Sequence, residues 1–380
     1  MGTFKVKNIP IILVYYILPI ISAIYTVILG GKGHLDYEVV WIGLWGILCL
    51  LSLQQPIRRS VCIGASVILL IFIFKYLLPV IWQKNVVWRA VFDDAKYIYY
   101  LLLSWMWVKF VGAPSVQFLY KAGRFLCLFY ILYFFIMIVL KGGYSRFELL
   151  SESNYDSFLL LIPFCFIQEE KKSRYDYFLF LIAVFLSGSK TGIATICILL
   201  FLYNFRNRKY RFLCWIIPPV LVVIFIYVYF MRRGITDVND VDRFIFFAQF
   251  FEYVKDSSWS SVLLGIFPGQ AMSFVEVLPS FEWYISKFEN MNNILGCYPF
   301  YFHSTYIRLA IVWGLPLVIG LIVLLVRIYM KTSYLPMKQL IVLFLIQSIS
   351  LSSLTLATVS VPFLIVMITI FSKHTIFSKS

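Results

Sequence analysis

Long apolar runs separated by short polar stretches repeat along almost the whole chain. There are twelve of them: 9–29, 38–53, 60–80, 97–112, 124–140, 157–168, 176–188, 190–205, 212–231, 305–328, 337–352 and 354–371. A helix needs about 20 mostly apolar residues to cross the hydrocarbon core of a bilayer, and the runs lack the alternation typical of a membrane β-barrel. The pattern predicts an all-α polytopic membrane bundle of about twelve transmembrane helices.

One large polar interval interrupts this pattern. It divides the chain into 1–231 with transmembrane helices 1–9, an external loop at 232–304, and 305–380 with helices 10–12 and a cytoplasmic tail. Inside the loop, apolar residues at near-helical spacing between Arg243 and Lys255 predict a helix on the membrane surface.

Glycine and proline predict two interruptions of regular structure. Gly265, Pro268 and Gly269 indicate a turn in the external loop. Gly314 and Pro316 predict a kink inside the tenth span, which a membrane helix tolerates when its neighbours satisfy the freed backbone groups.

Composition supports a membrane protein, and charge orients it. Hydrophobic residues make up 62% of the 380 residues and charged residues 13%. Lys and Arg gather in loops on one predicted side, most densely at 204–211, which places both termini in the cytoplasm. The net charge of +15 therefore reflects topology and contact with anionic lipids. We find no aromatic-interleaved basic face, so we expect no nucleic-acid partner.

Cysteine and histidine usage gives no indication of a metal or cofactor. Six of the seven cysteines lie in or beside apolar spans, and only Cys297 lies in an external loop. The three histidines are isolated in sequence. Neither a disulfide nor a metal site is expected.

Three short motifs carry the chemistry that remains. The first is Leu-Ser-Gly-Ser-Lys-Thr-Gly at 186–192, the second is Asp-Arg at 242–243, and the third is His-Ser-Thr-Tyr at 303–306. The predicted topology places all three on the external side. Lys190 and Arg243 are cations, His303 is a titratable base, and a helix start beside a cation favours anions. The combination suits an anionic, membrane-embedded substrate.

Each motif also has a simpler interpretation. Lys190 resembles a snorkelling lysine at an ordinary turn. Arg243 follows three aspartates and is typical of a surface ion pair. His303 resembles an interfacial histidine at a helix start.

In combination, the motifs are more specific. Over about 180–325 the chain resembles the bacterial O-antigen polymerase (Wzy) and O-antigen ligase superfamily, on Gly-Ser-Lys-Thr-Gly at 188–192, Asp-Arg at 242–243 followed by a Gly-rich turn, and His-Ser-Thr-Tyr-Ile at 303–307 with Gly314 downstream. Two residues depart from the family pattern. Lys190 replaces the common Arg, which keeps the charge and loses the bidentate fork, and Ser304 replaces the common Asn.

The resemblance implies a metal-independent glycosyltransferase without cofactors, on the outer face of the cytoplasmic membrane. It would move a glycan chain from undecaprenyl diphosphate to a hydroxyl of the next lipid-linked repeat unit, with the bilayer and a chain-length regulator as partners. Lys190 and Arg243 are expected to hold the diphosphate, and His303 to act on the acceptor hydroxyl, either as the base or by orienting a carboxylate from the outer loops. The neighbouring polar residues are expected to bind substrate: Ser189, Thr191, Tyr306 and Arg308.

Other functions stay open. Within the superfamily, the alternative is a ligase that moves finished glycan to lipid A core or another acceptor. A lipid-linked glycan flippase or a transporter would predict charges in mid-span and two repeated halves. Lys75 is the main charge inside a span, and no repeat is evident. A structural membrane protein would not predict the three motifs.

Overall fold

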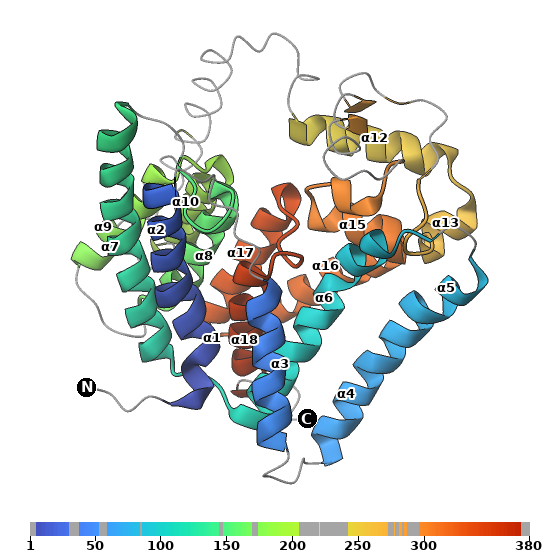
Figure 1. The fold of residues 1–380 in the computed structure, drawn as a ribbon, viewed down its shortest axis with the longest axis horizontal. Helices are drawn as coiled ribbons and strands as arrows, with labels where there is room; N and C mark the ends of the chain where they lie inside the picture. Colours follow the sequence, from blue (N-terminus) through green and yellow to red (C-terminus); the bar gives the residue numbers. More distant parts are fainter. Residues whose placement is uncertain are drawn as a thin grey trace.

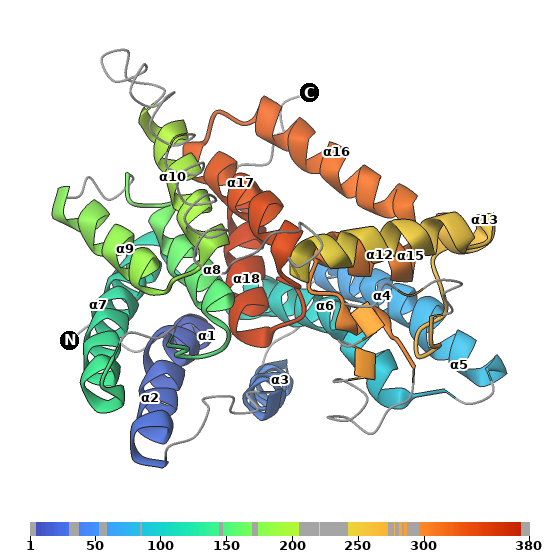
Figure 2. The same cartoon turned by 90° about the horizontal axis from the view of Figure 1, so that it is seen from above.

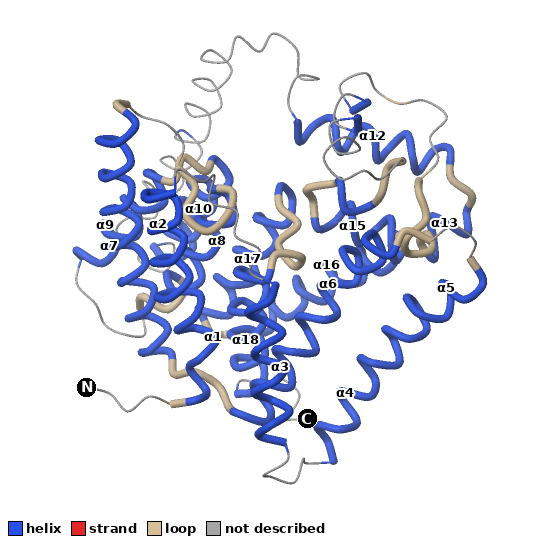
Figure 3. Tube along the Cα trace, in the orientation of Figure 1, coloured by secondary structure: helices blue, strands red, loops and turns tan. Residues whose placement is uncertain are grey.

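The computed structural model describes residues 5–29, 38–52, 59–83, 86–143, 147–168, 174–204, 220, 242–272, 277, 281–282, 285–286 and 296–373. Nearly all of these ranges are helical, and their one β-type pairing is an isolated bridge between Met272 and Cys297 (Figure 3). The all-α prediction is confirmed for this part of the chain.

The chain up to Asn204 contributes helices of very different length, some of them continued by a π-helical segment. They are α1 (Ile9–Ile12), α2 (Leu18–Leu29), α3 (Glu38–Ser52), α4 (Arg59–Phe72), α5 (Leu78–Trp82), α6 (Trp88–Met106), α7 (Val116–Lys141), α8 (Ser153–Phe164), α9 (Arg174–Leu186) and α10 (Lys190–Asn204). Three π-helical segments continue these helices: Leu13–Ile17 joins α1 to α2, Ile73–Leu77 joins α4 to α5, and Trp107–Val111 extends α6.

The second half contributes both short and long helices. They are α12 (Asp242–Asp256), α13 (Trp259–Leu264), a 3₁₀ turn at Pro299–Tyr301, α15 (Thr305–Trp313), α16 (Leu315–Lys331), α17 (Leu335–Ser350) and α18 (Ala357–Lys373). The surface helix predicted between Arg243 and Lys255 is confirmed as α12.

Helices α17 and α18 form the middle of the molecule. Figures 1 and 2 show α7–α10 on one side of them and α4–α6 with α12–α16 on the other. Helix α18 packs along α6, and α17 packs along α10. Segments that are distant in sequence therefore meet at the ends of the central pair.

The main core holds α7 and α8 against the N-terminal helices and α18. Tyr15 donates its hydroxyl to the carbonyl of Leu159 at 3.0 Å, which pairs a polar group where no water would be available in a membrane. On α7, a Cβ at Gly123 would lie 2.3 Å from Cβ of Pro163. The absence of a side chain there lets α7 and α8 approach closely, as small residues do between membrane helices.

Three described helices are long and apolar enough to cross a membrane: Val6–Ile28, Val61–Ile81 and Val116–Lys141. Shorter apolar helices are Tyr175–Leu186, Lys190–Leu202, Leu335–Ser350 and Ala357–Ser372. The structure thus has a helical bundle with segments of membrane-spanning length. This supports the predicted bundle but does not establish the predicted number of twelve spans. Apart from residue 220, the predicted ninth span, 212–231, lies outside the described residues.

The predicted kink in the tenth span is a complete break. Gly314 separates α15 from α16 with φ of +88°, a conformation that side chains disfavour. The turn predicted at Gly265 packs against this break, because a Cβ on Gly265 would lie 2.1 Å from the carbonyl oxygen of Val312. The Ile266 amide also donates to the carbonyl of Ile311 at 2.8 Å. The segment after α13 is thereby fixed to the end of α15.

Candidate functional site

The first motif forms a capped helix start. Ser189 precedes α10, and its hydroxyl accepts from the Gly192 amide at 3.0 Å, the usual geometry of an N-cap. The same hydroxyl donates to Oδ1 of Asn154 at 2.9 Å and accepts from Ser157 at 2.9 Å. Ser189 is fully buried. The structure therefore gives Ser189 a role in holding α10 against α8, and its substrate binding stays a prediction.

Gly192 is required by the same contact. A Cβ at this position would lie 2.5 Å from Oγ and 2.6 Å from Cβ of Ser157. Its bare backbone lets the first turn of α10 lie directly against α8. Lys190 is the first residue of α10 and is partly buried, so its ammonium is carried by a tightly fixed helix start.

Thr191 connects this helix start to α17. Its hydroxyl shares a hydrogen bond of 2.8 Å with the hydroxyl of Ser350, the last residue of α17. One turn further, Gln347 donates to the hydroxyl of Thr195 at 3.1 Å. The start of α10 therefore lies at the C-terminal end of α17.

The third motif reaches the same end of α17 from the other side. Ser304 donates its hydroxyl to the carbonyl of Ser348 at 3.1 Å, and Thr305 donates to the carbonyl of Leu351 at 2.7 Å. Thr305 also accepts from the backbone amide of Ser353 at 2.9 Å. The segment before α15 is thus fixed to the last turn of α17 and the turn after it.

The sequence analysis placed a turn between the spans that end at 352 and begin at 354, but it missed the contacts that this turn makes. We define residues 351–356 as the α17–α18 turn. Its hydroxyls bind the segment that contains the third motif: Ser352 donates to the carbonyl of Phe302 at 2.9 Å, and Ser353 shares a hydrogen bond of 3.0 Å with Thr305. Ser353 also shares a hydrogen bond of 2.9 Å with Ser348 of α17. The sequence signal for these contacts was the density of serine and threonine from Ser348 to Thr355, between two apolar segments. Hydroxyl groups in such a position need hydrogen-bond partners when they are buried.

Tyr306 and Arg308 use their polar atoms inside the protein. The Tyr306 hydroxyl donates to the carbonyl of Leu345 on α17 at 2.8 Å. Arg308 is buried and pairs with Asp94 of α6, with 3.3 Å between Nη2 and Oδ1; the two side chains are 7% and 0% exposed. Its other contacts are the Asp93 carbonyl at 2.9 Å and the Thr355 hydroxyl at 3.0 Å.

Both residues were predicted to bind substrate. In this geometry they position α15 against α17, α6 and the α17–α18 turn. Breaking a buried ion pair by removing one partner is costly, so the role of Arg308 in the fold is large whatever else it does.

His303 lies between this network and the second motif. Its ring is partly buried and contacts the ring of Phe246, with centroids 5.7 Å apart and planes tilted by 48°. Phe246 lies on α12, three residues after Arg243. Residues three apart on a helix are neighbours on its surface, so the backbone of Arg243 is one turn from the contact. The side chain of Arg243 lies outside the described part of the structure.

The first and third motifs therefore meet at the end of α17, and the third contacts α12, the helix that begins at the second motif. Thr191 and Ser304 bind residues of α17 that are two positions apart, and His303, next to Ser304, contacts α12. Among the described residues, no group of three or more His, Cys, Asp or Glu side chains is placed to hold a metal ion. A lysine at a helix start, a histidine and a set of hydroxyls can hold an anion and act on a hydroxyl group.

Comparison with known proteins identifies no relative. No family model matches the chain, and no curated protein and no solved structure is significantly similar to it.

Proposed function

We propose that this protein is a polysaccharide polymerase of the Wzy type. It transfers a growing glycan from undecaprenyl diphosphate to the next lipid-linked repeat unit, on the outer face of the cytoplasmic membrane. One observation carries the proposal: the start of α10, which holds Lys190, and the segment just before α15, which holds His303, both hydrogen-bond to the last turn of α17. Two motifs more than 100 residues apart would need this convergence to act on one substrate.

The proposed reaction is a direct displacement at the anomeric carbon. The acceptor hydroxyl oxygen bonds to that carbon, the bond to the diphosphate oxygen breaks, and undecaprenyl diphosphate leaves with the electron pair. Lys190 and Arg243 offset the charge that develops on the leaving diphosphate. His303 takes the acceptor proton, or orients a carboxylate that does so, since an imidazole titrates near neutral pH.

The topology of the proposal extends the bundle to twelve spans with both termini in the cytoplasm. Two features support it. Glu38 and Lys96, at the starts of the second and fourth predicted spans, form an ion pair at 3.1 Å, as expected for spans that both enter from the same side. Residues 187–190, 302–305 and 351–356 likewise gather at one end of α17. Cysteine labelling that finds position 303 exposed to the cytoplasm would reject this topology and the mechanism.

The decisive experiment compares the surface glycan of the source cells with and without the gene. We expect deletion of the gene to leave single-repeat surface glycans, and complementation to restore long chains. Lipid-linked polymer that accumulates and never reaches the surface would instead identify a ligase. Normal glycan in the deletion strain would reject both functions.

Variants then assign the site. Lys190→Ala, Arg243→Ala and His303→Ala should each abolish the long-chain ladder on a gel at normal membrane abundance. Lys190→Arg should retain substantial activity, since the charge remains and a guanidinium binds phosphate well. Lys141→Ala, an exposed cation at the end of α7, is the matched control and should leave chain length unchanged. Full ladders from both Arg243→Ala and His303→Ala would refute the site.

A further inference from the structure

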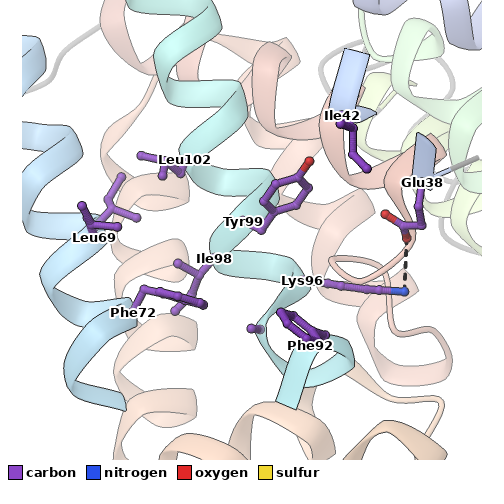
Figure 4. A pocket seen from close by; sticks show the side chains of 11 residues that line it. Glu38, Ile42, Leu69, Phe72, Phe92, Lys96, Ile98, Tyr99 and Leu102 are labelled. Carbon is purple, nitrogen blue, oxygen red and sulfur yellow. Dashed lines mark ion pairs between the residues drawn. The ribbon is translucent and has the colours of Figure 1, made fainter. Parts of the chain in front are cut away.

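An apolar groove lies between α3, α4 and α6, apart from the three motifs. Its volume is about 550 Å³, within the range of about 300–1,000 Å³ typical of ligand pockets. Ile42 lines it from α3, Leu69 and Phe72 from α4, and Ile98 and Leu102 from α6 (Figure 4). Ile42 is 64% exposed and Leu69 is 48% exposed, so the groove is open along its length to whatever surrounds the bundle.

The helix that forms the outer wall is poorly covered by protein. Only 11% of the most apolar window in Val61–Ile81 is buried, against 39% in Val116–Lys141 of α7. An apolar surface of this kind is stable when hydrocarbon covers it. The groove is therefore suited to a lipid chain that lies along α4.

One end of the groove carries charges of both signs. Lys96 pairs with Glu38 at 3.1 Å and with Asp93 at 2.8 Å, and Arg89 lies 3.8 Å from the other Asp93 oxygen. Figure 4 shows Lys96 reaching from α6 to Glu38, the first residue of α3. All four side chains are at least one-fifth exposed. Glu38 and Lys96 line the groove, and Asp93 and Arg89 lie beside them. We call these four residues the rim, which has two cations, two carboxylates and no net charge.

We propose that the groove binds one acyl chain of a zwitterionic phospholipid whose head group sits on this rim. The lipid ammonium would face Glu38 and Asp93, and its phosphate would face Lys96 and Arg89. The neutral rim argues against an anionic lipid or a polyprenyl diphosphate, because a head group with net negative charge needs a net positive site. This lipid site is independent of the proposed transferase activity.

The test is native mass spectrometry of the purified full-length protein. The protein is incubated with equal concentrations of phosphatidylethanolamine, phosphatidylglycerol and undecaprenyl phosphate. We expect one phosphatidylethanolamine to be retained. Leu69→Trp and Ile42→Trp fill the groove from opposite walls at exposed positions that tolerate a larger side chain, and each should weaken retention by at least about tenfold. Leu132→Trp, on the exposed face of α7, is the matched control and should change nothing.

A second variant tests the head-group assignment. Glu38→Gln leaves the rim with a net positive charge, so the retained lipid should shift toward phosphatidylglycerol. Preferential retention of phosphatidylglycerol or undecaprenyl phosphate by the unmodified protein would overturn the proposal. Equal retention by Leu69→Trp, Ile42→Trp and the control, with all three monodisperse on size-exclusion chromatography, would also overturn it.

Discussion

The starts of α10 and α15 meet the same end of α17, yet they are built from different chemistry. At α10, neutral hydroxyl and amide groups share several partners each, as Ser189 does with Asn154, Ser157 and Gly192. At α15, the structure has hydroxyl contacts and, in addition, one buried ion pair between Arg308 and Asp94. A shared network loses one bond at a time, whereas a buried ion pair loses its whole compensation when either partner is removed. We therefore expect α15 to be the more sensitive of the two to single substitutions.

Arg308→Met should have the largest effect on stability. It leaves the Asp94 carboxylate buried and unpaired, which we expect to cost about 3–5 kcal/mol of unfolding free energy. The measurement is denaturant unfolding of the detergent-solubilised protein. The double variant Arg308→Met with Asp94→Asn removes both charges and should recover much of the loss. A single variant as stable as the unmodified protein would show that the ion pair does not hold α15.

Gly192→Ala should have the next largest effect, on the α10 side. The new Cβ would overlap Ser157, and overpacking of this kind typically costs about 1–3 kcal/mol. Ser157→Gly opens the space that the methyl group needs, so the double variant should be more stable than the sum of the single changes predicts. Simple additivity in a double-mutant cycle would show that the two residues do not limit the approach of α8 and α10.

Ser189→Ala should destabilise by a smaller amount. Loss of an N-cap serine costs about 1 kcal/mol, and the neighbouring hydroxyls can re-pair with each other. Transfer activity should fall little if Ser189 only supports the helix start. A complete loss of activity with an unchanged unfolding curve would instead support the substrate-binding role that we expected from the sequence.

The fold could be predicted largely from the apolar pattern, and the site only in part. Run length predicted the helices, and glycine chemistry predicted the breaks at Gly265 and Gly314. The pattern could not show that Tyr306 and Arg308 point into the protein, because their partners Leu345 and Asp94 lie on helices distant in sequence. Side-chain direction depends on packing between helices, which periodicity along one helix does not encode.

The contacts of the α17–α18 turn were missed for a related reason. Serine and threonine are common at helix ends, so Ser352 and Ser353 looked like ordinary turn residues. What distinguishes them is burial: Ser352 is 4% exposed and Ser353 is fully buried. A buried hydroxyl needs a partner, and here the partners are the residues on either side of His303.

The smallest expected effect concerns the hydrogen bond between Thr191, at the start of α10, and Ser350, at the end of α17. Thr191 and Ser350 share one hydrogen bond of 2.8 Å, and such bonds between membrane helices contribute about 0.6 kcal/mol on average. Thr191→Val, Ser350→Ala and their double variant should therefore show a coupling energy of about this size in unfolding experiments. The proposed transfer activity should respond more strongly, because Thr191 follows Lys190 directly and its bond sets where the ammonium lies relative to the α17–α18 turn. Thr191→Ser keeps the hydroxyl and should restore activity, so the pair of variants separates the bond from the methyl group. If Thr191→Val keeps full polymer length, the bond to Ser350 does not set the position of Lys190, and the two helix starts are not coupled through this bond.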